Sequence, residues 1–266
     1  MRDTRDLGAG IAAASGARAA RAVAAAPLAV ALAGVVLLAL GTFAVGAVLL
    51  ALGAGAATAS RRLGSPARLA ARVGGRSADP VTDAGIVSVV DGLCVVLGLR
   101  APELRLLDDP AANAIVLGPD ASSAVLVVTT GLVAMLDRIE LEGLVAHELA
   151  HVRRGDLERA SLATRGLGLV ALFGSSAGRS VRRLAGPERE SLADLRAVSA
   201  TRYPPGLSSA LEKLSGAPGV RPAGLDTVTA RLTSALWCAQ LDEALDGTAR
   251  RGVLDVGERA AALREL

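Results

Sequence analysis

A long stretch without charged residues, residues 22–59, most constrains how this 266-residue chain can fold. The stretch is built mainly from Ala, Leu, Val and Gly. One helix that crosses a lipid bilayer needs about 20 apolar residues, so this stretch is long enough for two such helices. We therefore predict a transmembrane helical hairpin, with helices near 22–40 and 44–59 and a turn near Gly41. One long tilted helix is the alternative.

The residues in and around this stretch support the hairpin. Glycines recur at seven-residue spacing and would let the two helices pack closely: Gly34 and Gly41, then Gly46 and Gly53. Arginines flank both ends: Arg18 and Arg21 before, Arg61, Arg62, Arg68 and Arg72 after. Because positive residues favour the cytoplasmic side, both ends of the hairpin are predicted to be cytoplasmic. A single helix would place the residues that follow it across the membrane.

Composition gives the broad class of protein. With 52% hydrophobic residues and a mean hydropathy of +0.45, the chain is too apolar for a plain soluble enzyme, and its length allows one domain plus a membrane anchor. The net charge of +3 is too small to indicate nucleic-acid binding. Arginine supplies nearly all the positive charge, which is typical of a bacterial genome rich in G and C. The predicted organisation is a cytoplasmic tail (1–21), a transmembrane hairpin (22–59), a linker (60–80) and a domain (81–266).

Residues 81–266 read as an α+β domain that is mostly helical. Hydrophobic periodicity predicts a helix over 83–97 and short strands at 104–107, 114–117 and 124–129, which would form a small twisted sheet. Later helices are predicted over 182–202 and 207–215, then from 229 to the C-terminus. The apolar stretch 161–178 is interrupted by Arg165, so we predict a buried or membrane-surface helix there. Of the two cysteines, Cys94 and Cys238, the first fits a helix core.

The two histidines of the chain, His147 and His151, lie in one H-E-x-x-H motif with Glu148. Residues four apart share a face of a helix, so both imidazoles can reach one ion. This is the zinc-helix motif of metalloproteases, in which the glutamate acts as the base. Apolar flanking residues predict that the helix, near 137–154, is buried. Asp137 with Glu140 resembles a capping box at its start, and Gly155 is a candidate C-terminal stop.

A catalytic zinc ion commonly takes three protein ligands, and no third histidine exists. The third ligand is therefore a carboxylate or a cysteine. The predicted helix that contains Glu190 and Asp194 offers the best candidate. The alternative for Asp194 is an ordinary solvated acid, and the same holds for Asp156 near the end of the zinc helix.

Several motifs together resemble the HtpX-like membrane zinc endopeptidases, relatives of the CAAX prenyl proteases. They are His147-Glu148-Leu149-Ala150-His151, Gly155-Asp156, Arg189-Glu190-x-x-Ala193-Asp194 and Tyr203-Pro204-Pro205-Gly206-Leu207. The resemblance covers residues 22–215 and implies a zincin-like fold. It implies zinc ligands His147, His151 and Glu190, a catalytic base Glu148, and an Asp194 that orients a ligand histidine or shuttles a proton. With no spare histidine, Tyr203 or an arginine would steady the oxyanion.

The resemblance also implies a multi-pass protein of the bacterial inner membrane, with a cytoplasmic catalytic domain that cleaves misfolded or excess membrane proteins. The strand 124–129 is a candidate for binding substrate as an added β-strand; an ordinary core strand is the equal alternative. One rival function is a membrane-anchored scaffold or pseudoprotease whose zinc is structural, with Cys238 or Asp194 as a fourth ligand. Another is a CAAX-type processing protease. The sequence carries no signal for an oligomeric state.

Overall fold

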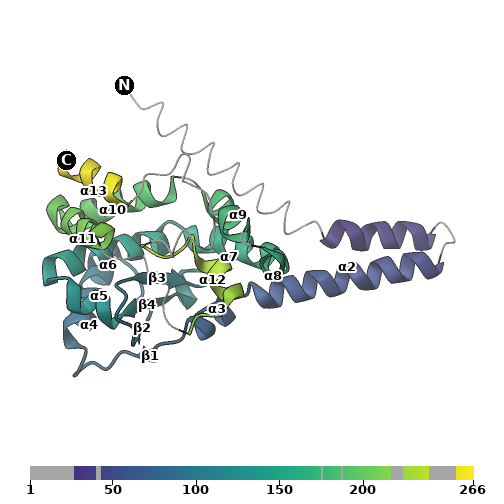
Figure 1. Ribbon diagram of the computed structural model, residues 1–266, viewed down its shortest axis with the longest axis horizontal. Coiled ribbons are helices and arrows are strands. Elements are labelled where there is room, and N and C mark those ends of the chain that lie inside the picture. Colours follow the sequence, from purple (N-terminus) through teal and green to yellow (C-terminus); the bar gives the residue numbers. More distant parts are fainter. Residues whose placement is uncertain (1–26, 40–42, 175, 187, 217–223, 240–255) are drawn as a thin grey trace.

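The computed structural model describes residues 27–39, 43–174, 176–186, 188–216, 224–239 and 256–266, so the predicted tail 1–21 lies outside it (Figure 1). The chain first forms the helix Pro27–Ala39, α2 (Phe43–Leu63), α3 (Pro66–Val73) and α4 (Ala84–Leu97). The strands are β1 (Arg76–Ser77), β2 (Glu103–Leu107), β3 (Ala114–Leu117) and β4 (Val125–Thr129). The later helices are α5 (Thr130–Met135), α6 (Arg138–Arg153), α7 (Asp156–Leu167), α8 (Val170–Phe173), α9 (Ser176–Ala185), α10 (Arg189–Thr201), α11 (Pro204–Gly216), α12 (Thr227–Thr233) and α13 (Val256–Arg264).

A mixed four-stranded sheet lies at the centre of the globular part, in the order β1-β2-β4-β3. Strand β4 is parallel to β2 and antiparallel to β3, and β1 is antiparallel to β2. The predicted α+β class, predominantly helical with a small sheet, is confirmed. Strand β4 has a neighbour on each side, however, so the prediction that 124–129 accepts an added substrate strand is wrong. Strand β3 is the edge strand on that side of the sheet.

Helices cover both faces of this sheet, and side chains alternate between two hydrophobic cores. Along β3, Ala114 and Val116 enter the core shared with α4, α6, α11 and α13, while Ile115 and Leu117 enter the core shared with α3, α7, α9 and α12. Figure 1 shows α6 close to the sheet, with α11 and α13 beyond it. The zinc-helix motif is therefore enclosed between the sheet and a second layer of helices.

The sequence around α6 explains its ends and its close packing. Asp137 caps it by accepting hydrogen bonds from the N–H groups of Ile139 and Glu140, and Glu140 returns a bond to the N–H of Asp137, which is a complete capping box. Gly155 ends the helix with a φ of 71°. In the middle, a Cβ on Gly143 would lie 2.6 Å from the backbone nitrogen of Leu207, so only glycine lets α11 approach this closely.

Two antiparallel helices project from the globular part, as Figure 1 shows. Their backbones meet at the glycines: a Cβ on Gly34 would lie 2.7 Å from the carbonyl oxygen of Gly46, and one on Gly53 would lie 2.7 Å from the backbone nitrogen of Ala31. The predicted turn near Gly41 lies outside the described residues. Among the described helices, one, α2, is long and apolar enough to cross a membrane, and Pro27–Ala39 is shorter. The two-span topology therefore stays a prediction.

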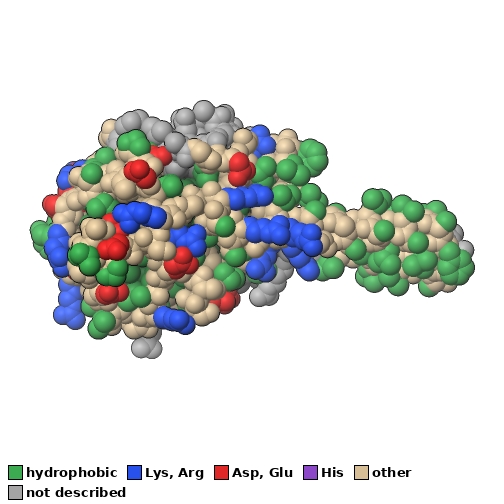
Figure 2. Space-filling model, turned by 90° about the horizontal axis from the view of Figure 1, so that it is seen from below, with side chains coloured by type: hydrophobic (Ala, Val, Ile, Leu, Met, Phe, Trp, Pro, Cys, Tyr) green, Lys and Arg blue, Asp and Glu red, His purple; other side chains and the backbone are tan. Residues whose placement is uncertain are grey.

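The surface of this hairpin is apolar, and the surface at its base is basic. Figure 2 shows hydrophobic side chains along the projecting helices and a group of Lys and Arg side chains where they join the globular part. The exposed large apolar residues of the two helices are Leu28, Val30, Leu32, Val35, Val36, Phe43, Val45, Val48 and Leu52. The exposed arginines at or just after the base are Arg61, Arg62, Arg68 and Arg72.

The base of the hairpin is fixed to the globular part. The Ser60 hydroxyl donates to the carbonyl oxygens of Arg165 and Gly166 in α7, and the Thr164 hydroxyl donates to that of Gly64. Residues 60–80 are not a plain linker as predicted, because they contain α3 and β1, and Leu69 of α3 is fully buried. The stretch 161–178 is divided among α7, α8 and α9 rather than forming one helix.

Candidate metal centre

Helices α6 and α10 bring the predicted site residues together. His147, Glu148 and His151 of α6 have 0%, 1% and 1% of their surface exposed, while the side chain of Glu190 on α10 keeps 19% exposure. The Nε2 atom of His147 lies 3.3 Å from Oε2 of Glu190, and Nε2 of His151 lies 3.6 Å from Oε1 of the same carboxylate. One potential ligand atom from each residue lies within 4.8 Å of the other two.

This spacing fits a tetrahedral metal ion. With ligand nitrogens and oxygens about 2.0–2.2 Å from zinc, two ligand atoms of a tetrahedron lie roughly 3.3–3.6 Å apart. The two nitrogen-to-oxygen distances fall in this range, one to each oxygen of the Glu190 carboxylate. In addition, neutral imidazole Nε2 atoms and a carboxylate are all hydrogen-bond acceptors, so their convergence calls for a cation or proton between them.

Two further carboxylates contact the opposite nitrogens of the same rings. Oδ1 of Asp194 lies 2.8 Å from Nδ1 of His147, and Oδ2 of Asp156 lies 3.0 Å from Nδ1 of His151. Such a contact places the ring proton on Nδ1 and leaves the Nε2 lone pair free to bind a metal ion. Asp194 and Asp156 are both buried, so neither is the solvated surface acid that was the alternative at the sequence level.

The charges around the site shift its pKa values in ways that follow from burial and neighbours. Burial lowers the pKa of His147, but the carboxylates of Asp194 and Glu190 outweigh it and raise that pKa to about 9. Burial lowers the pKa of His151 to about 4. Burial also raises the pKa of Glu148 to about 7. Desolvation opposes ionisation of Glu190, yet Arg189 and the histidines hold its pKa well below the ordinary value.

An arginine from the C-terminal helix completes the site. Arg259 of α13 is buried, and its guanidinium donates to both carboxylate oxygens of Asp194 over 2.8 and 2.7 Å. Its Nη1 lies 3.4 Å from Oε2 of Glu190. Sequence reasoning left the arginine unnamed, because nothing in the spacing from residue 194 to residue 259 shows that α13 returns to α10. Tyr203, the other candidate for steadying an oxyanion, is half exposed just before α11.

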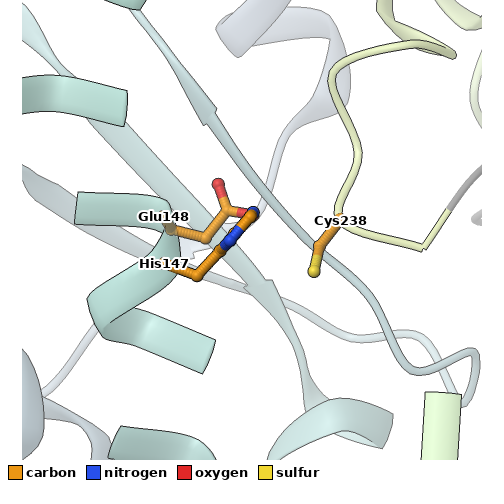
Figure 3. A group of neighbouring side chains, drawn as sticks. All are labelled: His147, Glu148 and Cys238. Atoms are coloured by element: carbon orange, nitrogen blue, oxygen red, sulfur yellow. The ribbon is translucent and has the colours of Figure 1, made fainter. Parts of the chain in front are cut away.

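Cys238 lies on the Glu148 side of the site. Its sulfur, a carboxylate oxygen of Glu148 and a ring nitrogen of His147 all lie within 4.8 Å of one another, and Figure 3 shows Cys238 on the segment that faces His147 and Glu148 of α6. Both carboxylate oxygens of Glu148 are buried without a hydrogen-bond partner among the described residues. The thiol is also buried, which raises its pKa well above the ordinary value.

Comparison with known proteins agrees with this geometry. Residues 80–211 match peptidase family M48. The match covers about half of this chain. It is 36% identical over 162 residues to a protein described as "Protease HtpX homolog" from Dictyoglomus thermophilum, covering 49% of this chain and 54% of that relative. A protein of the same description from Tropheryma whipplei strain Twist is 35% identical over 162 residues, covering 48% and 55%. The resemblance to HtpX-like proteases is therefore confirmed.

The M48 domain includes α6 and α10 and ends within α11. The chain spans about half the length of the curated relatives it matches: the matched region covers 54% of the first relative and 55% of the second. A third relative, the "Protease HtpX homolog" of Streptococcus pneumoniae strain Taiwan19F-14, is 27% identical over 182 residues, covering 53% of this chain and 61% of its own. Family and relatives together support a metalloprotease, and Cys238 and Arg259 lie beyond the residues that match the family.

Proposed function

We propose that this chain is a membrane-anchored zinc endopeptidase, with His147, His151 and Glu190 as the metal ligands. The observation that carries the proposal is the convergence of His147, His151 and Glu190, whose nitrogen-to-oxygen distances of 3.3 and 3.6 Å leave the three groups close enough to share one zinc ion. Two imidazoles and one carboxylate are also the donor set of known catalytic zinc sites.

Zinc held there would act as a Lewis acid toward the scissile carbonyl and lower the pKa of a water molecule toward about 7. Glu148 follows His147 directly in α6, and it is the carboxylate placed to take the proton of the attacking water. It would then return this proton to the leaving amine. In the metal-free chain, burial raises the pKa of Glu148 to about 7, so this carboxyl group holds a proton more readily than an exposed glutamate does.

Asp156 and Asp194 are the positioning residues of this mechanism. By accepting the Nδ1 protons of His151 and His147 they fix the orientation of each ring. Arg259 in turn holds Asp194 through two hydrogen bonds. This chain of contacts supports a role for Asp194 in orienting a ligand histidine, one of the two roles that the resemblance implied.

Membrane anchoring is supported by the apolar hairpin and by the helix beside its base. In α8, Phe173 is 88% exposed and Leu172 is 45% exposed. Leu172 lines a cleft of about 640 Å³ together with Ala54, Thr58 and other residues of α2. An apolar hairpin with arginines at its base fits a multi-pass protein of the inner membrane with a cytoplasmic domain. Its substrates would be misfolded or excess membrane proteins.

The test compares zinc content and casein cleavage of the purified full chain in detergent. Glu148→Gln should abolish cleavage and keep about one zinc per chain, and Glu190→Ala should lose zinc. Matched controls, Glu142→Gln on α6 and Glu188→Ala at the N-cap position of α10, should change neither. Cleavage that persists in Glu148→Gln would refute the mechanism. Full zinc content in a wild-type chain that never cleaves a protein would favour a structural site instead.

A further inference from the structure

We propose that the cleft between α2 and α8 binds one anionic phospholipid of the cytoplasmic leaflet, with an acyl chain along its apolar walls and the phosphate at Arg62. The proposal deepens the function proposed above and rests on its membrane-anchoring part, because the cleft must lie within the bilayer. It requires no metal ion, so its test is separate from the test of the protease.

The two walls of the cleft come from different parts of the chain and are largely apolar. On α2, Ala54 and Thr58 lie four residues apart and share a face of the helix with Arg62. The opposite wall is formed by Leu169, just before α8, and Leu172 within it. Figure 1 shows α8 beside the end of α2 that joins the globular part. The volume, about 640 Å³, lies within the range of about 300–1,000 Å³ that is typical of ligand pockets.

The position of the cleft along α2 fits the depth of lipid acyl chains. Ala54 and Thr58 belong to the charge-free stretch 22–59, and Arg61 and Arg62 follow it almost directly. From Ala54 to Arg62 the helix rises about 12 Å, at about 1.5 Å per residue. One leaflet supplies about 15 Å of hydrocarbon. The cleft therefore extends through most of one leaflet and ends where the headgroups begin.

Arg62 gives the cleft its charge. Among the described residues that line the cleft, it is the charged one, and it is exposed, as is Arg61 beside it. A guanidinium group binds phosphate oxygens in a two-pronged geometry. The cytoplasmic leaflet carries anionic lipids, which attract arginines close to the membrane surface. A molecule with an apolar chain and a negatively charged headgroup thus matches both ends of the cleft.

Helix α8 is held in place on two sides, so the cleft is a built feature of the fold. Arg231 of α12 donates to the carbonyl oxygen of Ala171 over 2.8 Å, and Ala171 is fully buried. Toward α2, a Cβ on Gly168 would overlap the carbonyl oxygen of Ser60, so the two backbones are in close contact. Phe173, which is 88% exposed, is thereby fixed beside the hairpin. The bilayer that surrounds the hairpin would cover this side chain as well.

The first experiment measures lipid binding to the purified full chain in detergent by native mass spectrometry. The probes are phosphatidylglycerol and phosphatidylcholine with identical acyl chains. The wild type should bind one phosphatidylglycerol about fivefold more tightly than phosphatidylcholine, the ratio expected for one arginine at a membrane surface. Arg62→Gln should remove this preference, and Arg68→Gln, an exposed arginine outside the cleft, should keep it. An equal preference in Arg62→Gln and the wild type overturns the headgroup assignment.

Gly55→Leu tests the acyl-chain part of the site in the same assay. Gly55 lines the cleft, and a Cβ there meets open space, so leucine should fill the cleft without a clash. Binding of both lipids should weaken, whereas Ala51→Leu, an exposed residue of α2 outside the cleft, should bind them as the wild type does. Unchanged lipid binding by Gly55→Leu overturns the proposal. A dimer of the chain that Gly55→Leu dissociates would also overturn it, because a second copy would then occupy the cleft.

The second experiment measures the depth of α8. Phe173→Cys is labelled with bimane in nanodiscs whose lipids carry a spin label near the headgroup end of an acyl chain. Cys94 and Cys238 are buried, so the label should react with the introduced cysteine. The control is Val81→Cys, at an apolar position with a similar exposure of 83%.

Spin-labelled lipids should quench the bimane at position 173 and leave the one at position 81 unchanged. Equal fluorescence at position 173 with and without spin-labelled lipid overturns the proposal. A chain that does not enter nanodiscs at all would instead overturn the membrane-anchoring part of the proposed function. Neither experiment depends on zinc or on peptide cleavage, so failure of the metal mechanism leaves both results interpretable.

Discussion

Replacing Asp156 by Asn tests how the carboxylates behind the histidines contribute to metal binding. The Asp156 side chain is fully buried and lies 3.0 Å from Nδ1 of His151. Asparagine keeps the shape and can still accept the Nδ1 proton, so the change removes the charge alone. A hydrogen bond to a charged group contributes about 1.5–3 kcal/mol and a neutral one about 0.5–1.5 kcal/mol. The difference, about 1–1.5 kcal/mol, corresponds to a loss of roughly tenfold in zinc affinity.

The assay is competition between the metal-free protein and a fluorescent zinc chelator. Asp156→Asn should raise the zinc dissociation constant about tenfold, and Asp156→Ala, which removes the acceptor altogether, up to about 100-fold. The control is Asp120→Asn, because Asp120 caps a short 3-10 helix (Ala121–Ser123) and asparagine caps helices equally well. Equal zinc affinities of Asp156→Asn and Asp120→Asn, with both proteins folded by circular dichroism, would refute the role given to Asp156.

Two further predictions concern the base and the hairpin. Burial raises the pKa of Glu148 from 4.5 to about 7, so protonation of Glu148 stabilises the metal-free fold below pH 4.5 and this stabilisation is lost as pH rises through about 7. This stabilisation amounts to about 3 kcal/mol. The wild type should lose it between pH 4 and pH 8, whereas Glu148→Gln should not, so the stability of the metal-free variant should rise by about that much relative to the wild type. Melting temperatures of the two proteins that change equally with pH would contradict this. A Cβ on Gly34 would lie 2.6 Å from the backbone nitrogen of Leu50, so Gly34→Ala should destabilise the hairpin by about 1–3 kcal/mol in a detergent thermal melt. Gly55→Ala, where a Cβ meets open space, should not, and equal effects of the two would show that the helices are not in contact at Gly34.

The sequence predicted the parts of the site that depend on local spacing. The pairing of His147 with His151 follows from helical periodicity, and the capping box from the Asp137–Glu140 spacing, which the structure contains. Strands β2, β3 and β4 follow from short apolar runs between turn residues. Each of these patterns is confined to a few neighbouring residues, so it depends little on contacts with distant parts of the chain.

Contacts between distant segments could not be predicted in the same way. The central position of β4 depends on strand order, which the apolar runs do not encode, so the sequence left open whether 124–129 is an edge strand that binds substrate or an ordinary core strand. The residues 234–239 carry helix-compatible residue types, yet Cys238 and Ala239 bond Ala114 and Asn113, more than 120 positions earlier. Helix α3 could not be predicted for the same reason. Its arginine-rich sequence is typical of a linker, and only the structure shows that Leu69 packs into the core shared with α7, α9 and α12.

Arg259 shows why the functional unit is larger than the segment that matches M48. The guanidinium forms a two-pronged pair with Asp194, and the contact with Glu190 is the longer one, at 3.4 Å. Asp194 is thereby neutralised behind His147, while Glu190 makes longer contacts, with Arg189 at 3.2 Å and Arg259 at 3.4 Å. Without Arg259, Asp194 would be a buried carboxylate that has lost its cation, which costs about 3–5 kcal/mol. Helix α13 therefore stabilises the ionised form of the carboxylate that contacts His147, and it belongs to the candidate metal centre as much as α6 and α10 do.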